Sequence, residues 1–204
     1  MEKKLSENTI NLFKKRRSFY NITNSSLISD DEIMEIVQTV VTCTPSAFNS
    51  QSTRIVLLLN DQHKKFWELT KSVLQQITTK DKHSSMSDKV DQSFASGYGT
   101  ILFFEDESVI LGLQENFPTY KEKFPVWSQH TNAMHQLTMW VMLEDAGFGA
   151  SLQHYNPVID DEVIKTWNLD PNWKLIAQMP FGLPLSEPGE KESESLDARI
   201  KLFK

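Results

Sequence analysis

The sequence is organised around one short loop, Pro45-Ser46-Ala47-Phe48-Asn49-Ser50-Gln51. An apolar-periodic helix precedes this loop and a β-branched strand follows it, so the loop joins two firm elements. It carries more amide and hydroxyl groups than a connection requires, and such groups suit a planar heteroaromatic ligand with donor and acceptor edges. The alternative is a capped loop in which Ser46 and Asn49 bond only local backbone groups.

A second polar stretch ends the first predicted helix, residues 6–17, and reads Arg16-Arg17-Ser18-Phe19-Tyr20. Two adjacent arginines followed by a hydroxyl offer forked cations for a phosphate or another electron-rich oxygen. The neighbouring Lys14 and Lys15 require no ligand, because cations near a helix C-terminus compensate the helix dipole.

The remaining chain alternates helices with a few strands. A capping box at residues 29–32 opens a helix that Pro45 ends, and the following strand, residues 53–59, is apolar enough to be buried on both faces. Further strands are expected at residues 99–105, 149–153 and 173–179, with an edge strand at 199–203. Residues 79–92 are expected to form a mobile polar excursion, and residues 117–127 an irregular, lid-like loop. This order predicts a single α+β or α/β domain over residues 1–204.

The longest predicted helix spans residues 128–147. Between residues 133 and 143 it is apolar on nearly every side. A helix of this kind is buried, either in a large core or against a partner subunit. Since two-fold dimers are the commonest oligomers, the sequence favours considering a homodimer.

The bulk composition limits the function classes. The 204 residues are 39% hydrophobic and 24% charged, with a formal net charge of −6. This balance is typical of a soluble globular protein and disfavours a broad nucleic-acid footprint or an anionic membrane surface. No apolar run reaches the length of a membrane span, and the first residues lack an apolar signal core. The only cysteine, Cys43, excludes an internal disulfide, favours a cytoplasmic location and is expected to be a buried thiol.

Several common kinds of site are absent from the sequence. The five histidines lack metal-ligand spacing, so no metal site is expected. Neither a dinucleotide-binding glycine fingerprint nor a P-loop is present. A serine nucleophile elbow is missing, and Cys43 has no obvious histidine partner.

Three motifs in order carry a family resemblance. The run RRSF, the loop PSxxNxQ before a strand, and GASLQHYNP at residues 149–157 resemble the FMN-dependent nitroreductase family. The resemblance is to the small single-domain members that reduce nitro compounds and peroxides. It implies a nitroreductase-like α+β sandwich, with a mostly antiparallel central sheet flanked by helices. It also implies an intertwined homodimer with FMN at each subunit interface.

The same resemblance implies which residues contact FMN. One set would grip the phosphate and the ribityl–pyrimidine part: Arg16, Arg17 and Ser18, with Tyr20 in the same stretch. The loop would reach that flavin from the other subunit through Pro45, Ser46, Asn49 and Gln51. A second loop would lie near the hydride-accepting nitrogen through Gln153, His154 and Tyr155. Lys191 would complete the phosphate clamp, with Arg199 as the alternative.

This chain departs from the family pattern around Lys191, which stands among glutamates rather than in a basic pair. The alternative for Lys191 is a solvated tail, and the alternative for His154 is a structural histidine.

The implied activity is a ping-pong reaction. NAD(P)H would reduce FMN by hydride transfer, and a small electron-poor acceptor, such as a nitroaromatic, quinone or hydroperoxide, would then be reduced. Because a flavin carries the redox step itself, no catalytic side chain is expected. One alternative is a non-catalytic FMN-binding reservoir or redox sensor on the same scaffold. Another is a protein-interaction domain without flavin, in which Arg16 and Arg17 only compensate a helix dipole.

Overall fold

The computed structural model describes residues 7–204, apart from the side chains of residues 80–83. Residue 6, the first of the predicted N-terminal helix, lies outside this range. The helices are α1 (Glu7–Lys15), α2 (Asp30–Cys43), η1 (Ala47–Asn49), α3 (Asn60–Ile77), α4 (Lys80–Ser93), α5 (Glu107–Asn116), η2 (Pro118–Tyr120), α6 (Phe124–Asp145), α7 (Asp160–Thr166) and α8 (Leu196–Arg199). The strands are β1 (Ile22–Thr23), β2 (Thr53–Leu59), β3 (Gly99–Asp106), β4 (Gly149–Ala150) and β5 (Trp173–Pro184).

The strands form one antiparallel sheet in the order β1-β5-β3-β2, with β4 also paired to β5. All eight residues of β3 are buried, because β3 lies between β2 and β5 and is covered on both faces. Side chains alternate along a strand, so Ile101 and Phe103 enter one core while Leu102 and Phe104 enter the other. The predicted α+β fold with a mostly antiparallel sheet is therefore confirmed.

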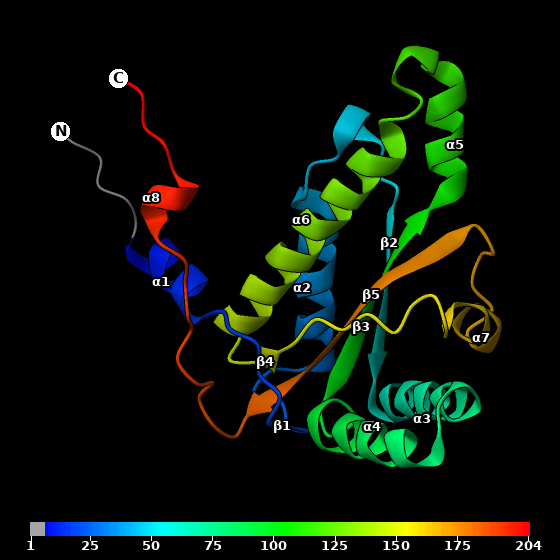
Figure 1. Cartoon of the computed structure of the whole chain (residues 1–204), viewed down its shortest axis with the longest axis vertical. Coiled ribbons are helices and arrows are strands. Elements are labelled where there is room, and N and C mark those ends of the chain that lie inside the picture. Colours follow the sequence, from blue (N-terminus) through cyan, green and yellow to red (C-terminus); the bar gives the residue numbers. More distant parts are fainter. Residues whose placement is uncertain (1–6) are drawn as a thin grey trace.

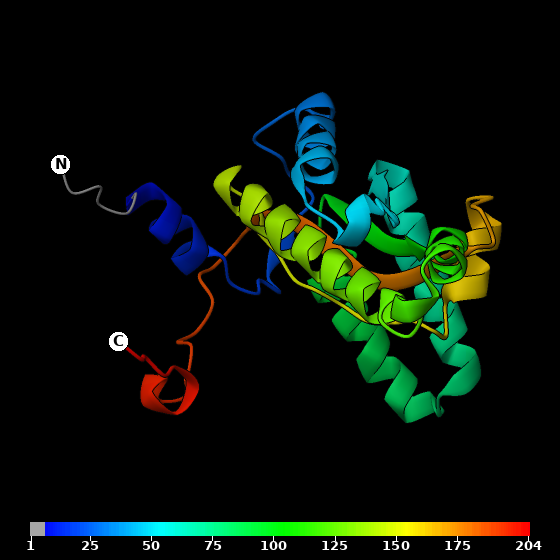
Figure 2. The same ribbon diagram turned by 90° about the horizontal axis from the view of Figure 1, so that it is seen from above.

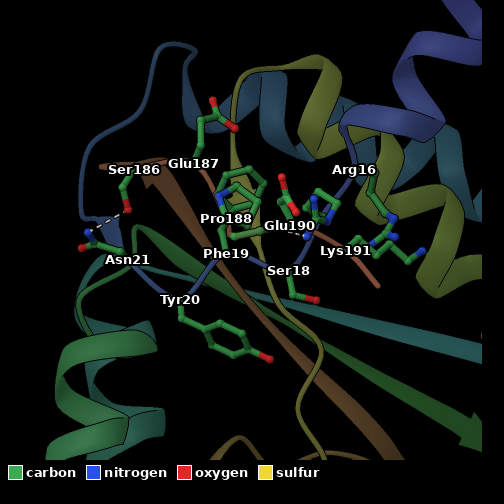
Figure 3. A pocket seen from close by; sticks show the side chains of 12 residues that line it. Arg16, Ser18, Phe19, Tyr20, Asn21, Ser186, Glu187, Pro188, Glu190 and Lys191 are labelled. Atoms are coloured by element: carbon green, nitrogen blue, oxygen red, sulfur yellow. Dashed lines mark hydrogen bonds between the residues drawn. The ribbon is translucent and has the colours of Figure 1, made fainter. Parts of the chain in front are cut away.

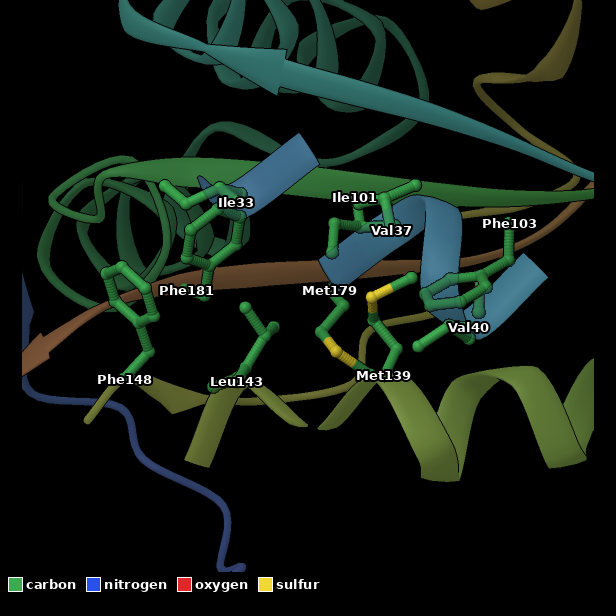
Figure 4. Packing of buried hydrophobic residues seen from close by; sticks show 12 residues of the cluster. Ile33, Val37, Val40, Ile101, Phe103, Met139, Leu143, Phe148, Met179 and Phe181 are labelled. Carbon is green, nitrogen blue, oxygen red and sulfur yellow. The ribbon is translucent and has the colours of Figure 1, made fainter. Parts of the chain in front are cut away.

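Helices cover both faces of the sheet (Figure 1). The first core packs α2 and α6 on β3 and β5, and its fully buried members include Val40, Met139 and Met179 (Figure 4). The second core packs α3, α4 and α7 on the opposite face around Phe66, Trp67 and Phe94. α2 begins where the sequence predicts, because Ser29 Oγ accepts a hydrogen bond from the Glu32 amide and the Glu32 carboxylate accepts one from the Ser29 amide.

The two ends of the chain project from this body. α1 and α8 extend beyond the sheet and its covering helices (Figure 2). No residue of α1 is buried, and Phe13 is 55% exposed. Beyond α8, Ile200, Leu202 and Phe203 are exposed as well. Apolar side chains on projecting segments have no core to enter within one chain.

Several sequence expectations were wrong. Cys43 is exposed rather than buried. Residues 80–93 form α4 rather than an excursion, because Val90 and Phe94 bury one side of that segment. Strand β2 is mostly half-buried, since it lies at the sheet edge. Residues 199–203 form no edge strand, because Arg199 ends α8 and the following residues pair with none of the strands.

The long apolar helix also begins earlier than expected, at Phe124 rather than Ser128. The expected irregular loop therefore shrinks to η2 and a turn. Pro125 sits in the first turn of α6, where a proline is tolerated because its missing amide hydrogen has no partner there. Among residues 7–204, no helix combines the length and the apolar character needed to cross a bilayer.

A buried histidine links α3 to the sheet. His63 Nε2 lies 3.2 Å from the Ala95 carbonyl, so it donates, and Nδ1 accepts from the Thr100 hydroxyl at 2.8 Å. Thr100 in turn accepts from Trp67 Nε1 at 2.9 Å. The carbonyl fixes the neutral tautomer, and burial lowers the pKa of His63 from its ordinary value of 6.5 to about 4.

The contribution of His63 to the stability of the fold should therefore fall in acid. Below pH 6.5 His63 binds a proton in the unfolded chain, whereas in the folded chain it stays neutral down to about pH 4. Between about pH 7.5 and about pH 5, His63 should remove about 2 kcal/mol of unfolding free energy. Urea denaturation at both pH values measures this loss.

The comparison is made with His63→Gln, which removes the titration, and with His130→Gln, which removes an exposed histidine. Burial raises the pKa of Asp160 to about 6, so Asp160 stabilises the fold at low pH and opposes the slope of His63. Asp160 is present in all three proteins, so the difference between them isolates His63. If the unfolding free energy of His63→Gln changed with pH as much as that of the wild type, the lowered pKa of His63 would be contradicted.

Candidate functional site

A pocket of about 510 Å³ opens where α1 meets the C-terminal segment (Figure 3). Its walls are residues 16–21 and residues 186–191, which lie about 170 positions apart in the sequence. Arg16, Arg17, Ser18, Tyr20 and Lys191 all line it, so the structure brings together five residues that the sequence selected. Arg199, the alternative to Lys191, lies on α8 and does not line this pocket.

Arg16, Arg17 and Lys191 are the three cations of this pocket. Arg17 Nη2 donates to the Gly189 carbonyl at 2.6 Å, and the Arg16 guanidinium lies 4.4 Å from the centre of the Trp140 ring. Neither arginine nor Lys191 forms a salt bridge within the part of the chain that the structure describes. Three cations that form no salt bridge in the described chain can attract a phosphate, although Glu187 and Glu190 also line the pocket.

Main-chain bonds hold the pocket in shape. Leu185 donates its amide hydrogen to the Asn21 carbonyl at 2.9 Å, which ties the C-terminal segment to the first motif. The amide of Phe19 donates to the Ala150 carbonyl at 2.9 Å, so Ser18 and Phe19 run beside β4. A Cβ at Gly149 would lie 2.7 Å from the Phe19 ring, so only glycine permits this approach. The first motif and the GASLQHYNP segment are thus neighbours.

The three predicted residues of that second segment differ in their surroundings. Gln153 pairs with Gln178 of β5 through both main-chain groups and is half-buried, while His154 is exposed. The Tyr155 ring packs among Trp67 and Phe94 in the second core, and burial raises the pKa of its hydroxyl. The Tyr155 amide already donates to Gln178 at 2.7 Å. Gln153 Nε2 donates to Ser151 Oγ at 3.0 Å, so His154 is the exposed side chain of this segment and Gln153 keeps only its amide oxygen for a ligand.

The Pro45–Gln51 loop lies at the opposite end of α6 from the cationic pocket. Ser46 Oγ accepts from the Gln51 amide at 3.0 Å, so the local capping alternative holds for Ser46. Asn49 is exposed, and its side chain forms no hydrogen bond with another described residue. Pro45 and Gln51 are exposed too.

This loop has an unusual backbone. Phe48, Asn49 and Gln51 have φ values of 57°, 51° and 48°, in the left-handed region. Asparagine tolerates that region, but phenylalanine and glutamine occupy it at a cost of about 1 kcal/mol or more each. Such strain persists only where the surroundings over-determine it, and four aromatic rings pack around Phe48.

Phe48 is the centre of this aromatic group. Its ring centroid lies 5.1 Å from Phe117, 5.3 Å from Phe124 and 6.0 Å from Trp127, and Tyr120 is also in contact. The Trp127 ring is stacked on Phe48. Beside them opens a mostly apolar pocket of about 370 Å³, whose lining also includes Met134 and His130. This surface can stack a planar ring.

A smaller pocket, of about 140 Å³, also borders the loop. Ser46 and Gln51 line it together with Thr44, Arg54 and His135. His135 is buried, which lowers its pKa, and its Nδ1 lies 3.0 Å from the Thr131 carbonyl. The Thr44 hydroxyl is buried with no hydrogen-bond partner among the described residues. This polar pocket offers additional donors next to the predicted loop.

The family is decided by comparison of the whole chain with known sequences. The profile described as Nitroreductase family matches residues 13–183, from α1 to the end of β5. The chain belongs to the nitroreductase family. The matched range contains the RRSF run, the PSxxNxQ loop and the GASLQHYNP segment, so the predicted family is confirmed.

Known relatives agree with this nitroreductase membership. HBN1 of Saccharomyces cerevisiae is 34% identical over 173 residues, which cover 85% of each chain. CinD of Lactococcus lactis, a nitroreductase solved with nicotinic acid, is 34% identical with a TM-score of 0.86. The alignment covers 96% of this chain and all of CinD, which has also been solved with chloramphenicol and with 4-nitrophenol.

A more distant structure shares only the fold. It is a nitroreductase from Desulfovibrio desulfuricans with FMN, 17% identical with a TM-score of 0.69. The alignment covers 98% of this chain and all of the other. Among the described residues of the present nitroreductase, no group of three or more His, Cys, Asp or Glu side chains is arranged to hold a metal.

The sequence did not single out several residues of these pockets. Phe48 stands inside the Pro45–Gln51 loop, but no sequence signal indicates that its ring meets the rings of residues 117–127. Arg54 and His135 look like ordinary members of a strand and a helix. Only the packing of η1 against α6 places them beside the loop.

The cationic pocket should bind inorganic phosphate without any flavin. At ten times its Kd, phosphate should add about 1.4 kcal/mol to the stability of flavin-free protein, because it binds only the folded state. Thermal unfolding at constant ionic strength, with chloride as the reference anion, measures the shift. The double substitution Arg16→Ala with Arg17→Ala should abolish it.

The control is Lys14→Ala, which removes an exposed cation of the preceding helix α1 that does not line the pocket. This variant should keep the phosphate shift. If the double variant kept it as well, the two arginines would not form the anion site.

Proposed function

We propose that this protein is an FMN-dependent oxidoreductase that uses NAD(P)H to reduce small electron-poor acceptors. The observation that carries the proposal is the 510 Å³ pocket lined by three cations that form no salt bridge with another described residue. It lies beside the segment that family resemblance assigns to the flavin ring. The phosphate of FMN fits such a pocket by charge, and a Desulfovibrio nitroreductase of the same fold binds FMN.

Different residues of the chain would bind different parts of FMN. Arg16, Arg17 and Lys191 would hold the phosphate, and Ser18 would contact the adjoining ribityl chain. Gln153 and His154 would lie near the ring. When bound, FMN would supply the redox chemistry, taking a hydride, which is two electrons and one proton, from NAD(P)H and passing two electrons to the acceptor.

We further propose that each site is shared by two copies of the chain. The cationic pocket touches α6 at Trp140 and the Pro45–Gln51 loop touches it at Trp127. Thirteen residues of helix separate these contacts by about 20 Å. A loop that far from the phosphate pocket would serve the flavin of a second copy rather than its own.

Exposed apolar side chains along α6 support this arrangement. Met134 and Leu137, which lie between the two contacts, are 40% and 45% exposed in one chain. The projecting α1 and the segment after α8 carry further exposed apolar residues. A homodimer would remove these side chains from water, at roughly 25 cal/mol per Å² of apolar surface.

The aromatic group around Phe48 supports the choice of acceptors. Stacked rings favour a planar, electron-poor partner, which matches nitroaromatics and quinones. The relative CinD has been solved with chloramphenicol and with 4-nitrophenol, both of which carry a nitroaromatic ring. Hydroperoxides remain further candidates. The single cysteine, which allows no internal disulfide, supports a cytoplasmic location.

The first test is the visible absorption spectrum of FMN-loaded protein, without oxygen, before and after NADPH or NADH is added. Bleaching of the flavin bands, followed by their return when 4-nitrophenol or a quinone is added, is the expected result. Bands that persist with both nicotinamides would favour the non-catalytic reservoir or sensor. Protein that binds no FMN would contradict the flavoprotein assignment and favour the interaction domain.

The shared site is tested by mixing two defective chains. One carries Arg16→Ala with Arg17→Ala, and the other carries Asn49→Ala with Gln51→Ala. Each variant alone should lose FMN while keeping its fold, which circular dichroism checks. After co-expression, about a quarter of the sites should recover FMN, because half of the dimers are mixed and each has one intact site.

Two controls complete the mixing experiment. Either variant co-expressed with a second tagged copy of itself should recover no FMN. If the mixture also recovered none although mixed dimers formed, both sets would act within one copy, and the shared site would be refuted.

A further inference from the structure

The cationic pocket also contains carboxylates of the chain itself. Glu187 and Glu190 line the same pocket as Arg16, Arg17 and Lys191. In the view of Figure 3 the Glu190 side chain lies between Pro188 and the arginine and lysine group, and the Glu187 carboxylate points toward the outer rim. Neither carboxylate forms a salt bridge within the described chain.

Negative charge also crowds the pocket from the helix beneath it. Glu144 of α6 is partly buried close to Arg16, and its pKa is raised by burial and then by the charge of Glu187. The C-terminal segment therefore brings acidic as well as basic groups to one place. The three cations and two carboxylates that line the pocket leave it with a net charge of only +1.

The backbone fixes these carboxylates near the pocket. The main-chain bond from Leu185 to Asn21, the bond from Asn21 Nδ2 to Ser186 Oγ at 3.2 Å, and the bond from Arg17 to Gly189 attach residues 185–189 to the first motif. Glu187 lies inside this attached stretch and Glu190 directly follows it. A phosphate bound by the arginines would therefore be repelled by the negative charges of Glu187 and Glu190.

We propose that Glu187 and Glu190 are specificity-determining residues that weaken the hold of this pocket on a phosphate dianion, so that the flavin is bound loosely and exchanges. This inference rests on the proposed function, because the relevant phosphate is that of FMN. The physical reason is Coulomb repulsion between each carboxylate and the dianion, which acts over a pocket of this size and offsets part of the attraction by the cations. The repulsion acts only on the phosphate group. The affinity for riboflavin, which has no phosphate, is therefore unaffected.

The test measures the affinity of flavin-free protein for FMN, riboflavin and inorganic phosphate. Flavin fluorescence follows the first two, and thermal unfolding follows the third. Glu190→Gln should lower the Kd for FMN about three- to tenfold at low salt, as expected for removing one charge near a dianion in a solvated pocket. Glu187→Gln should act in the same direction. The Kd for riboflavin should not change.

Glu192→Gln is the matched control. Glu192 belongs to the same acidic segment and is exposed, but it does not line the pocket. This variant should bind FMN like the wild type. The gain in FMN affinity of Glu190→Gln should also shrink as salt is added, because salt screens exposed charges. A gain caused by a change in the shape of the pocket would not depend on salt.

The outcomes separate this inference from the proposed function. Unchanged FMN and phosphate affinities in Glu187→Gln and Glu190→Gln, or an equal gain with riboflavin, would overturn the inference while leaving an FMN-binding enzyme intact. Tighter phosphate binding by these variants, with no binding of FMN by any protein, would support the charge effect and refute the proposed function.

Discussion

The complete burial of β3 is the constraint on which the rest of the molecule depends. β3 hydrogen-bonds to β2 on one side and to β5 on the other, and its side chains alternate between two separate cores. α6 can dock on one face only because Ile101 and Phe103 present an apolar surface there. That docking in turn fixes where the first motif, the second segment and the Pro45–Gln51 loop meet the body of the protein.

α6 acts as a rigid spacer within this arrangement. One end supports the cationic pocket through Trp140, and the other supports the aromatic group through Trp127. A straight helix does not bend to bring such ends together, so the two sets of polar residues stay apart within a chain. The strained backbone at Phe48 fits the same picture, because a phenylalanine in the left-handed region is stable only when its ring is held by neighbours.

The C-terminal segment gives the cationic pocket a mixed electrostatic character. The lysine among glutamates looked in the sequence like an incomplete version of a basic clamp. In the folded chain the same residues bring Lys191 beside the arginines and bring Glu187 and Glu190 with it. Charge repulsion and attraction in one exposed pocket make the affinity for an anion tunable by single side chains and by salt.

The sequence by itself determined those features whose signals act over a few residues. The capping box at Ser29, the strand Thr53–Leu59 and the apolar β3 segment were readable because propensity and periodicity are local. The three motifs were sufficient to identify the family. The predicted cofactor residues were readable only through that family resemblance.

The tertiary structure decided whatever depends on distant residues meeting. It placed Lys191 in one pocket with Arg16 and Arg17, because β5 leads the C-terminal segment back past residues 16–21. It turned the polar residues after α3 into a helix, because Val90 and Phe94 found a core to enter. It left Cys43 exposed, since burial depends on which face of α2 meets the sheet. Such contacts are set by packing of the whole chain, and no short window of sequence contains them.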